Sequence, residues 1–287
     1  MNLQKVLSMA LTASIMLTVL GLGLTATWPQ VTSLLRRPTL LLRSLLSMNV
    51  LMPVVTALVA TAFAFPFEVR LALVALAVSP VPPVLYKRQL GAGGTRAYVV
   101  GLLVAMALLA IVLVPASVWV LDRIYAASFS VSPMAIAAIM LRTILLPLAA
   151  GLLVRSVLPA AEKASAHIIA LAGLLLVVGA AMLLYTLWPL TRQLIGNGTV
   201  LMMAVVAALG LLIGHALGGP EPPNRTALAL ATCSRHPAVA FAIASGTGAP
   251  ARSLLAAILL YVVVSAIVSI PYGNWRARRA AAGAVPA

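Results

Sequence analysis

The sequence predicts an all-α polytopic membrane protein, with one transmembrane transporter domain over residues 1–287. Hydrophobic residues make up 63% of the chain and charged residues only 8%, whereas soluble domains carry about 25% charged residues. The mean hydropathy is +1.14. The apolar runs are long enough to cross a bilayer, and the loops between them are too short to hold a further domain.

Apolar runs separated by turn residues predict nine transmembrane helices. They cover roughly residues 8–27, 40–65, 67–90, 95–121, 131–156, 166–190, 197–217, 225–246 and 250–272. Ser79-Pro80-Val81-Pro82-Pro83 interrupts the third run, and Arg235-His236-Pro237 interrupts the eighth. Proline removes a backbone donor and breaks the helical ladder, so we expect two broken helices. The predicted break or hinge residues are Pro80, Pro82, Pro83 and Pro237.

The basic residues orient the chain in the membrane. Twelve Lys and Arg fall on one side and five on the other, and the richer side is cytoplasmic. We therefore expect a cell-membrane protein with its N-terminus outside and residues 276–287 as a basic cytoplasmic tail. These loop residues also explain the net charge of +15, so the expected partner is the lipid bilayer and no nucleic acid. Arg142 lies inside a span and is expected to snorkel towards the outer surface.

The spacing of the predicted spans indicates an inverted repeat. Pro80 and Pro237 are 157 residues apart, and the spans around them keep nearly the same offset. Spans 1–4 then correspond to spans 6–9, an odd shift that reverses their direction in the membrane. Half one covers about residues 1–125 and lacks its first helix, and half two covers about 126–275. Interrupted helices at matching positions are typical of secondary transporters with a site at the midplane.

Both interrupted spans resemble those of the bile acid:sodium symporter family. The run from Ala231 to Gly246 is similar to the family's second broken helix, and Ser79–Gly94 to its first. Gly21-Leu-Gly-Leu, Arg36-Arg37-Pro38 and Pro53 fit its early helices. The resemblance implies two broken helices that cross in a core domain, with a panel domain that rocks against it. It also implies secondary transport of organic anions, coupled to sodium in many members.

The chain departs from this family at the sodium site. The family uses a glutamate and a glutamine on the second broken helix, and this chain has Ala231 and Arg235 there. The family's alcohol–asparagine pair corresponds to Leu85 and Tyr86. Hard cations want oxygen ligands, and alanine, leucine and arginine side chains supply none. We therefore expect no metal site, no cofactor and no sodium coupling, while coupling to protons stays open.

Arg235 is the centre of the predicted site. An arginine at the bilayer centre costs about 2.5–3.5 kcal/mol on insertion scales. Our hypothesis is that its guanidinium replaces the bound cation by donating to free carbonyls near Pro80, and that it can also bind a substrate carboxylate or phosphate. His236 is either a proton-coupling group or a neutral side chain bonded to a carbonyl. The predicted substrate-binding residues are Arg235, His236, Ser234, Thr232, Ser79 and Tyr86.

These features predict a secondary transporter of a small or amphipathic organic anion that works by alternating access. The alternative is a transporter-derived membrane sensor or partner subunit that transports nothing, which the loss of the sodium ligands favours. An enzyme is not expected, because the membrane interior carries no carboxylate, no metal-ligand cluster and no Ser/His/Asp constellation.

Overall fold

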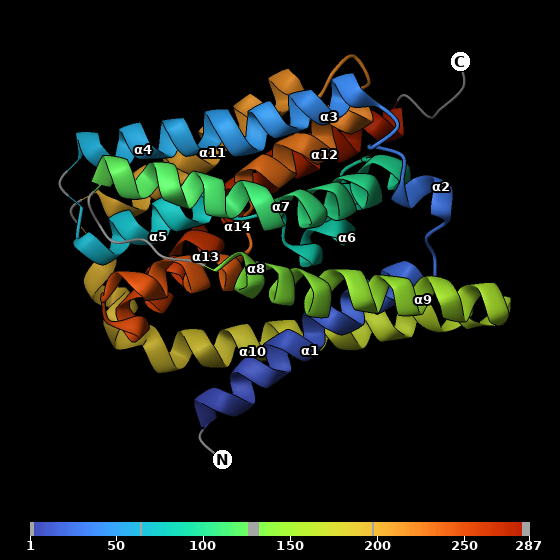
Figure 1. Ribbon diagram of the computed structural model, residues 1–287, viewed down its shortest axis with the longest axis horizontal. Helices are drawn as coiled ribbons and strands as arrows, with labels where there is room; N and C mark the ends of the chain where they lie inside the picture. Colours follow the sequence, from blue (N-terminus) through green and yellow to red (C-terminus); the bar gives the residue numbers. More distant parts are fainter. Residues whose placement is uncertain (1–2, 64, 126–131, 197, 283–287) are drawn as a thin grey trace.

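The computed structural model of the chain describes residues 3–63, 65–125, 132–196 and 198–282. Within these ranges all regular structure is helical, as the sequence predicts, and there is no strand (Figure 1). The helices are α1 (Leu3–Gly23), α2 (Trp28–Val31), α3 (Pro38–Leu45), α4 (Met52–Ala62), α5 (Phe67–Val78), α6 (Tyr86–Gly91), α7 (Arg96–Tyr125), α8 (Pro133–Met140), α9 (Leu146–Val157), α10 (Ser165–Leu194), α11 (Thr199–Leu217), α12 (Pro222–Cys233), α13 (Pro237–Ala244) and α14 (Ala251–Ala282).

The described helices form a multi-span membrane fold. Seven stretches are long and apolar enough to cross a membrane, or eight when the bent pair Phe67–Val78 and Pro83–Gly91 counts as one span. The predicted number of nine also needs α1, which runs over 21 residues from Leu3 to Gly23 but is not among the stretches counted here. At the other end α14 reaches Ala282, so the first residues of the predicted tail continue the last helix.

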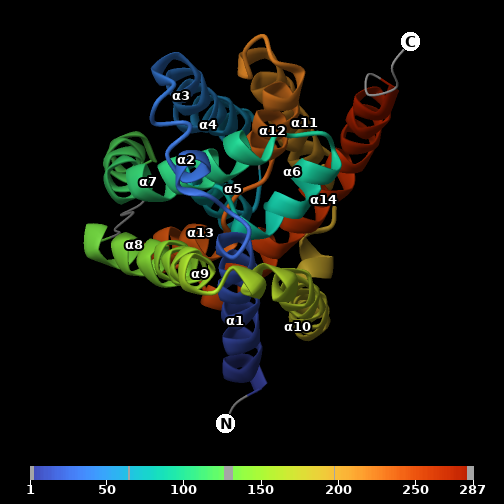
Figure 2. The same ribbon diagram turned by 90° about the vertical axis from the view of Figure 1, so that its right-hand side faces the viewer.

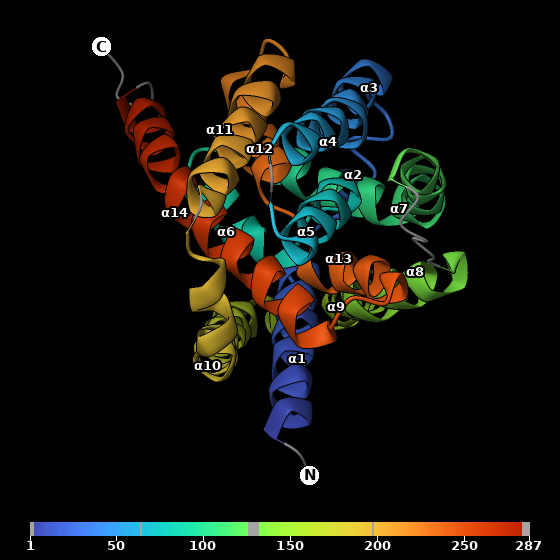
Figure 3. The same cartoon turned by 90° about the vertical axis from the view of Figure 1, so that its left-hand side faces the viewer.

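The helices pack in two groups, which are clearest when the molecule is seen from its ends (Figures 2 and 3). In one group α1 lies against α9 and α10. In the other, α11 packs against α12 and α14, and α5 packs against α4, α13 and α14. α8 continues into α9 of the first group, and it contacts α7, which lies with the second group. The groups also meet where α10 contacts α14. This arrangement places the broken spans inside the second group.

Glycines allow α1 and α9 to touch backbone to backbone. A Cβ atom built on Gly23 would lie 2.5 Å from the carbonyl oxygen of Leu148. One built on Gly151 would lie 2.5 Å from the carbonyl oxygen of Leu20. Small residues that bring backbones together are a common means of packing membrane helices, since lipid gives no hydrophobic drive for helices to associate.

The contact between α1 and α10 also uses glycine on each helix. A Cβ atom on Gly21 would lie 2.4 Å from the side chain of Ile169, and one on Gly179 would lie 3.0 Å from the side chain of Leu11. The two contacts are related by a constant offset: Gly179 lies 158 residues after Gly21, and Ile169 lies 158 residues after Leu11. The same offset separates Ser14 and Ala172, whose hydroxyl and carbonyl form a 2.7 Å hydrogen bond.

A π-helical turn, Leu46–Leu51, joins α3 to α4. In such a turn each N–H bonds the carbonyl five residues earlier, as the N–H of Met52 does with the carbonyl of Ser47. The next residue, Pro53, has no N–H. The carbonyl of Met48 therefore receives no bond from its own helix in this register.

A second π-helical turn, Leu141–Leu145, joins α8 to α9. The N–H of Leu146 bonds the carbonyl of Leu141, again five residues earlier. Pro147 follows and has no N–H, so it leaves the carbonyl of Arg142 without a donor in this register. Arg142 itself lies exposed on this turn.

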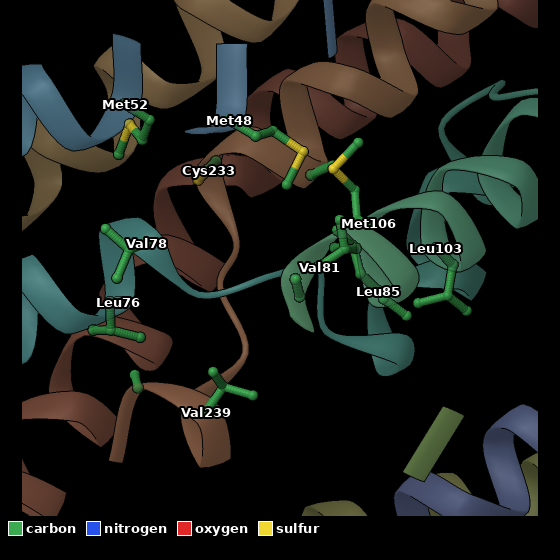
Figure 4. Close-up of a cluster of buried hydrophobic side chains, with 14 of the residues drawn as sticks. Met48, Met52, Leu76, Val78, Val81, Leu85, Leu103, Met106, Cys233 and Val239 are labelled. Carbon is green, nitrogen blue, oxygen red and sulfur yellow. The ribbon is translucent and has the colours of Figure 1, made fainter. Parts of the chain in front are cut away.

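Each interrupted span consists of two helices joined by extended backbone. α5 ends at Val78, and after a short link the chain resumes as a 3₁₀ turn and α6, at 70° to α5. α12 ends at Cys233, and α13 begins at Pro237. Figure 4 shows the two links beside each other, surrounded by apolar side chains that include Met48, Val81 and Val239.

We predict that replacing Gly151 by leucine destabilises the fold. The new side chain would have to displace the backbone of α1, and overpacking typically costs about 1–3 kcal/mol. Thermal unfolding of the purified protein in detergent should show the midpoint falling by several degrees. Gly173→Leu is the matched control, because a Cβ atom there meets nothing within 4 Å. Equal midpoints for the two variants would contradict the packing described above.

Candidate functional site

The two extended links bond to each other. The backbone N–H of His236 donates to the carbonyl oxygen of Pro80 at 3.0 Å and to the hydroxyl oxygen of Ser79 at 3.1 Å. That hydroxyl donates in turn to the carbonyl of Leu76 at 2.8 Å. Residues that are 157 positions apart in the sequence thus meet at one crossing point, buried among apolar side chains.

The guanidinium of Arg235 fills this crossing and is only 3% exposed. Its Nη1 donates to the carbonyl oxygen of Ser79 at 3.1 Å, and its Nη2 donates to the carbonyl oxygen of Met48 at 2.9 Å. Hydrogen bonds from a charged donor are stronger than neutral ones. Arg235 therefore ties the first broken span and the π-helical turn to the second broken span.

Prolines explain why these two carbonyls are available. If α5 continued as a helix, the carbonyl of Ser79 would bond the N–H four residues later, where Pro83 has none. The carbonyl of Met48 lacks a donor in the same way because of Pro53. A buried carbonyl without a donor is costly, and Arg235 supplies a donor to each.

A third freed carbonyl lies in the second broken span. Pro237 cannot donate to the carbonyl of Cys233, and that oxygen instead accepts the hydroxyl of Tyr261 at 3.0 Å. Tyr261 lies on α14 and is 1% exposed. Sequence reasoning did not single it out, because nothing in a lone tyrosine of an apolar run shows which carbonyl it will meet.

The imidazole of His236 is fully buried beside Arg235. Both ring nitrogens, Nδ1 and Nε2, have no hydrogen-bond partner in the part of the chain that the structure describes. Buried polar atoms of this kind usually have a partner. The bond from a neutral imidazole to a carbonyl, one of the two alternatives for His236, is therefore not formed between described residues, and the other, proton coupling, stays a prediction.

The other predicted site residues lie at different distances from the crossing. Thr232 is buried, and its hydroxyl shares a 2.7 Å hydrogen bond with that of Ser47 on the π-helical turn. Ser234 is half-buried in the second link. Tyr86 is buried at the start of α6. No hydrogen bond between described residues joins the Ser234 or Tyr86 side chain to Arg235 or His236.

The prolines predicted as break residues occupy the ends of helices. Pro80 and Pro82 lie in the extended first link, and Pro83 begins the 3₁₀ turn that precedes α6. Pro237 is the first residue of α13, a position where a missing N–H costs nothing.

The positions that correspond to the family's sodium ligands are buried. Ala231 is 0%, Leu85 is 6% and Tyr86 is 7% exposed, and Arg235 bonds main-chain oxygens as described above. Within the described ranges, no three His, Cys, Asp or Glu side chains are grouped in a way that could hold a metal ion. The guanidinium of Arg235 is therefore the cation that binds main-chain oxygens at this site.

Comparison with known proteins identifies one family. Residues 12–192 match the model described as the Sodium Bile acid symporter family. The match covers more than half of the chain, from α1 to α10, and includes the first broken span but not the second. The comparison with curated proteins gives no match.

We predict that Arg235→Leu strongly destabilises the fold. The variant leaves two buried carbonyls without donors, and each such loss typically costs about 1–3 kcal/mol. Thermal unfolding in detergent should show a large fall in the midpoint. Arg192→Leu is the control, because Arg192 is exposed at the end of α10. A midpoint for Arg235→Leu within a degree of the wild type would show that the guanidinium does not hold the crossing.

Proposed function

This chain belongs to the sodium bile acid symporter family, and we propose that it is a secondary transporter of a small or amphipathic organic anion that works by alternating access. The family match and the apolar helices support a membrane transport protein. We further propose that it lies in the cell membrane with the C-terminal end of α14 on the cytoplasmic side, in accordance with the distribution of basic residues.

We propose that the chain is an inverted repeat divided into a core and a panel. A two-fold axis between α1 and α10 would place each residue of α1 where the residue 158 positions later lies on α10. The contact of Gly21 with Ile169 and that of Gly179 with Leu11 correspond in this way. The group of α1, α9 and α10 would be the panel, and the group that contains the crossing would be the core. Rocking of one group against the other would then expose the substrate site to each side in turn.

We infer that transport does not require sodium. The observation that carries this inference is the pair of hydrogen bonds from Arg235 to the carbonyls of Met48 and Ser79. A guanidinium at this position supplies permanently the positive charge that a bound ion would supply only while bound. Its charge also disfavours a second cation close by.

Both terminal nitrogens of Arg235 already donate to main-chain carbonyls, and only its Nε has no partner within the described chain, so we propose another residue as the contact for the anion. Arg142 also lies well inside a predicted span, away from its ends, and it has no hydrogen-bond or ion-pair partner in the described part of the chain. It lies nine residues after Pro133, or about 14 Å along the helix, whereas half of the hydrocarbon core is about 15 Å. In place of the snorkelling expected from the sequence, we propose that Arg142 meets the substrate anion in the membrane, since an unpaired arginine against lipid is costly.

The alternative function is a membrane sensor or partner subunit derived from a transporter. The fixed cation at the crossing favours it, because a permanent charge removes the ion-binding step that drives many secondary transporters. A sensor would still bind an anion but would not move it across the membrane. Binding and uptake measured on the same preparation separate the two functions.

We predict uptake without a sodium gradient. Purified protein in proteoliposomes should take up labelled taurocholate or labelled pyruvate, down its gradient, equally fast in sodium and in potassium buffer. Empty liposomes are the control. Uptake that requires sodium would contradict the role given to Arg235. Thermal stabilisation by either anion without any uptake would contradict transport and support the sensor, because a ligand stabilises the state it binds.

We predict that Arg142→Gln weakens the interaction with the transported anion. A hydrogen bond to a charged group contributes about 1.5–3 kcal/mol, so KM should rise roughly tenfold or more, while Arg142→Lys retains part of the affinity. Arg192→Gln, at an exposed position on α10, should leave KM unchanged. A wild-type KM for Arg142→Gln would exclude Arg142 from the substrate site.

A further inference from the structure

A separate pocket, lined by charged, polar and apolar residues, opens where the first long span begins. It has a volume of about 300 Å³ and lies between the start of α3 and the turn that joins α11 to α12, two elements that Figure 2 shows side by side. One side of the pocket is formed by Arg43 on α3 and by Arg37, the residue before α3. The other side is formed by Gly219 and Glu221 in the turn and by Asn224 at the start of α12. The proposed transport site uses none of these residues.

The pocket carries an excess positive charge. Arg37 forms a 3.2 Å ion pair with Glu221, and their side chains are 59% and 53% exposed. Arg43 has no hydrogen-bond or ion-pair partner in the ranges that the structure describes. Its guanidinium lies over the turn, where a Cβ atom on Gly219 would be 3.4 Å from Nη1. One cation is thus neutralised within the pocket and the other is not.

Asn224 lines the same pocket and carries a buried acceptor. The residue is 2% exposed, and its amide Nδ2 donates to Oε2 of Glu221 at 3.0 Å. This bond fixes which end of the amide is nitrogen, because a carboxylate accepts but does not donate. The amide oxygen Oδ1 is buried and has no partner within the described chain. A buried acceptor of this kind normally receives a donor.

The backbone holds these groups in place. Gly219 has a φ of +81°, which favours glycine, and its carbonyl accepts Nε of Arg225 at 2.6 Å. A Cβ atom on Gly218 would lie 2.3 Å from Cα of Arg225. The turn is therefore closely packed against the start of α12.

We propose that this pocket binds the headgroup of an anionic phospholipid that carries a hydroxyl group, of the phosphatidylglycerol class. Arg43 binds the phosphate, and Oδ1 of Asn224 accepts the hydroxyl. A lipid is the source of this phosphate because the same span presents Leu42 and Leu46, which are 66% and 40% exposed, as a surface for acyl chains. The positive-inside rule assigns this end of the span to the inner leaflet.

Native mass spectrometry of the full chain in detergent tests the proposal. Titration with phosphatidylglycerol should give at least about tenfold tighter binding than phosphatidylcholine, and Arg43→Gln should weaken it about tenfold, the factor expected for one hydrogen bond to a charged group. Arg36→Gln is the matched control, because it removes the same charge on the same side and does not line the pocket. Equal binding by wild type and Arg43→Gln would overturn the proposal.

The hydroxyl contact has its own test. Wild type should prefer phosphatidylglycerol to phosphatidic acid, and Asn224→Leu should lose this preference while still binding both lipids. Thermal unfolding identifies any variant that fails to fold, and in that case the lipid comparison on the wild-type protein decides. A wild type without this preference would overturn the role of Asn224. Equally tight binding of water-soluble glycerol phosphate would overturn the assignment to a lipid.

Discussion

The two hydrogen bonds that Arg235 donates to main-chain carbonyls hold the centre of this structure together. Three prolines leave main-chain carbonyls at this centre without their helical donors. Pro53, Pro83 and Pro237 each withhold an N–H from a carbonyl, and each freed oxygen is taken by a side chain: two by Arg235 and one by Tyr261. In an apolar interior an unpaired carbonyl is costly, so the broken helices are stable only because donors from distant parts of the chain reach them.

In the function proposed above, the cation that holds the crossing is distinct from the cation that meets the substrate. Arg235 is buried, and both of its terminal nitrogens are bonded to the backbone. In the function proposed above, the crossing therefore keeps its charge through the whole cycle, and Arg142 is the residue that encounters the anion. The same chain would thus use one guanidinium as part of its scaffold and another as a recognition group.

Much of the fold could be predicted from composition and from the positions of prolines, because apolar length and missing N–H groups are local properties. The burial of Arg235 also follows from the apolar residues on both sides of it. The acceptor at Met48 could not be predicted, since it depends on a π-helical turn and on a contact across 187 residues. Tyr261 was missed for the same reason.

The second π-helical turn has a mechanical consequence. A helix resists bending because its hydrogen bonds must lengthen on the convex side. At the carbonyl of Arg142 there is no such bond to stretch, since Pro147 has no N–H. The stiffness of the helix from Pro133 to Val157 is therefore lowest at that residue. α8 contacts α7, whereas α9 contacts α1. Because the helix bends most easily between them, α8 can move with α7 and α9 with α1 at a small cost in bending energy.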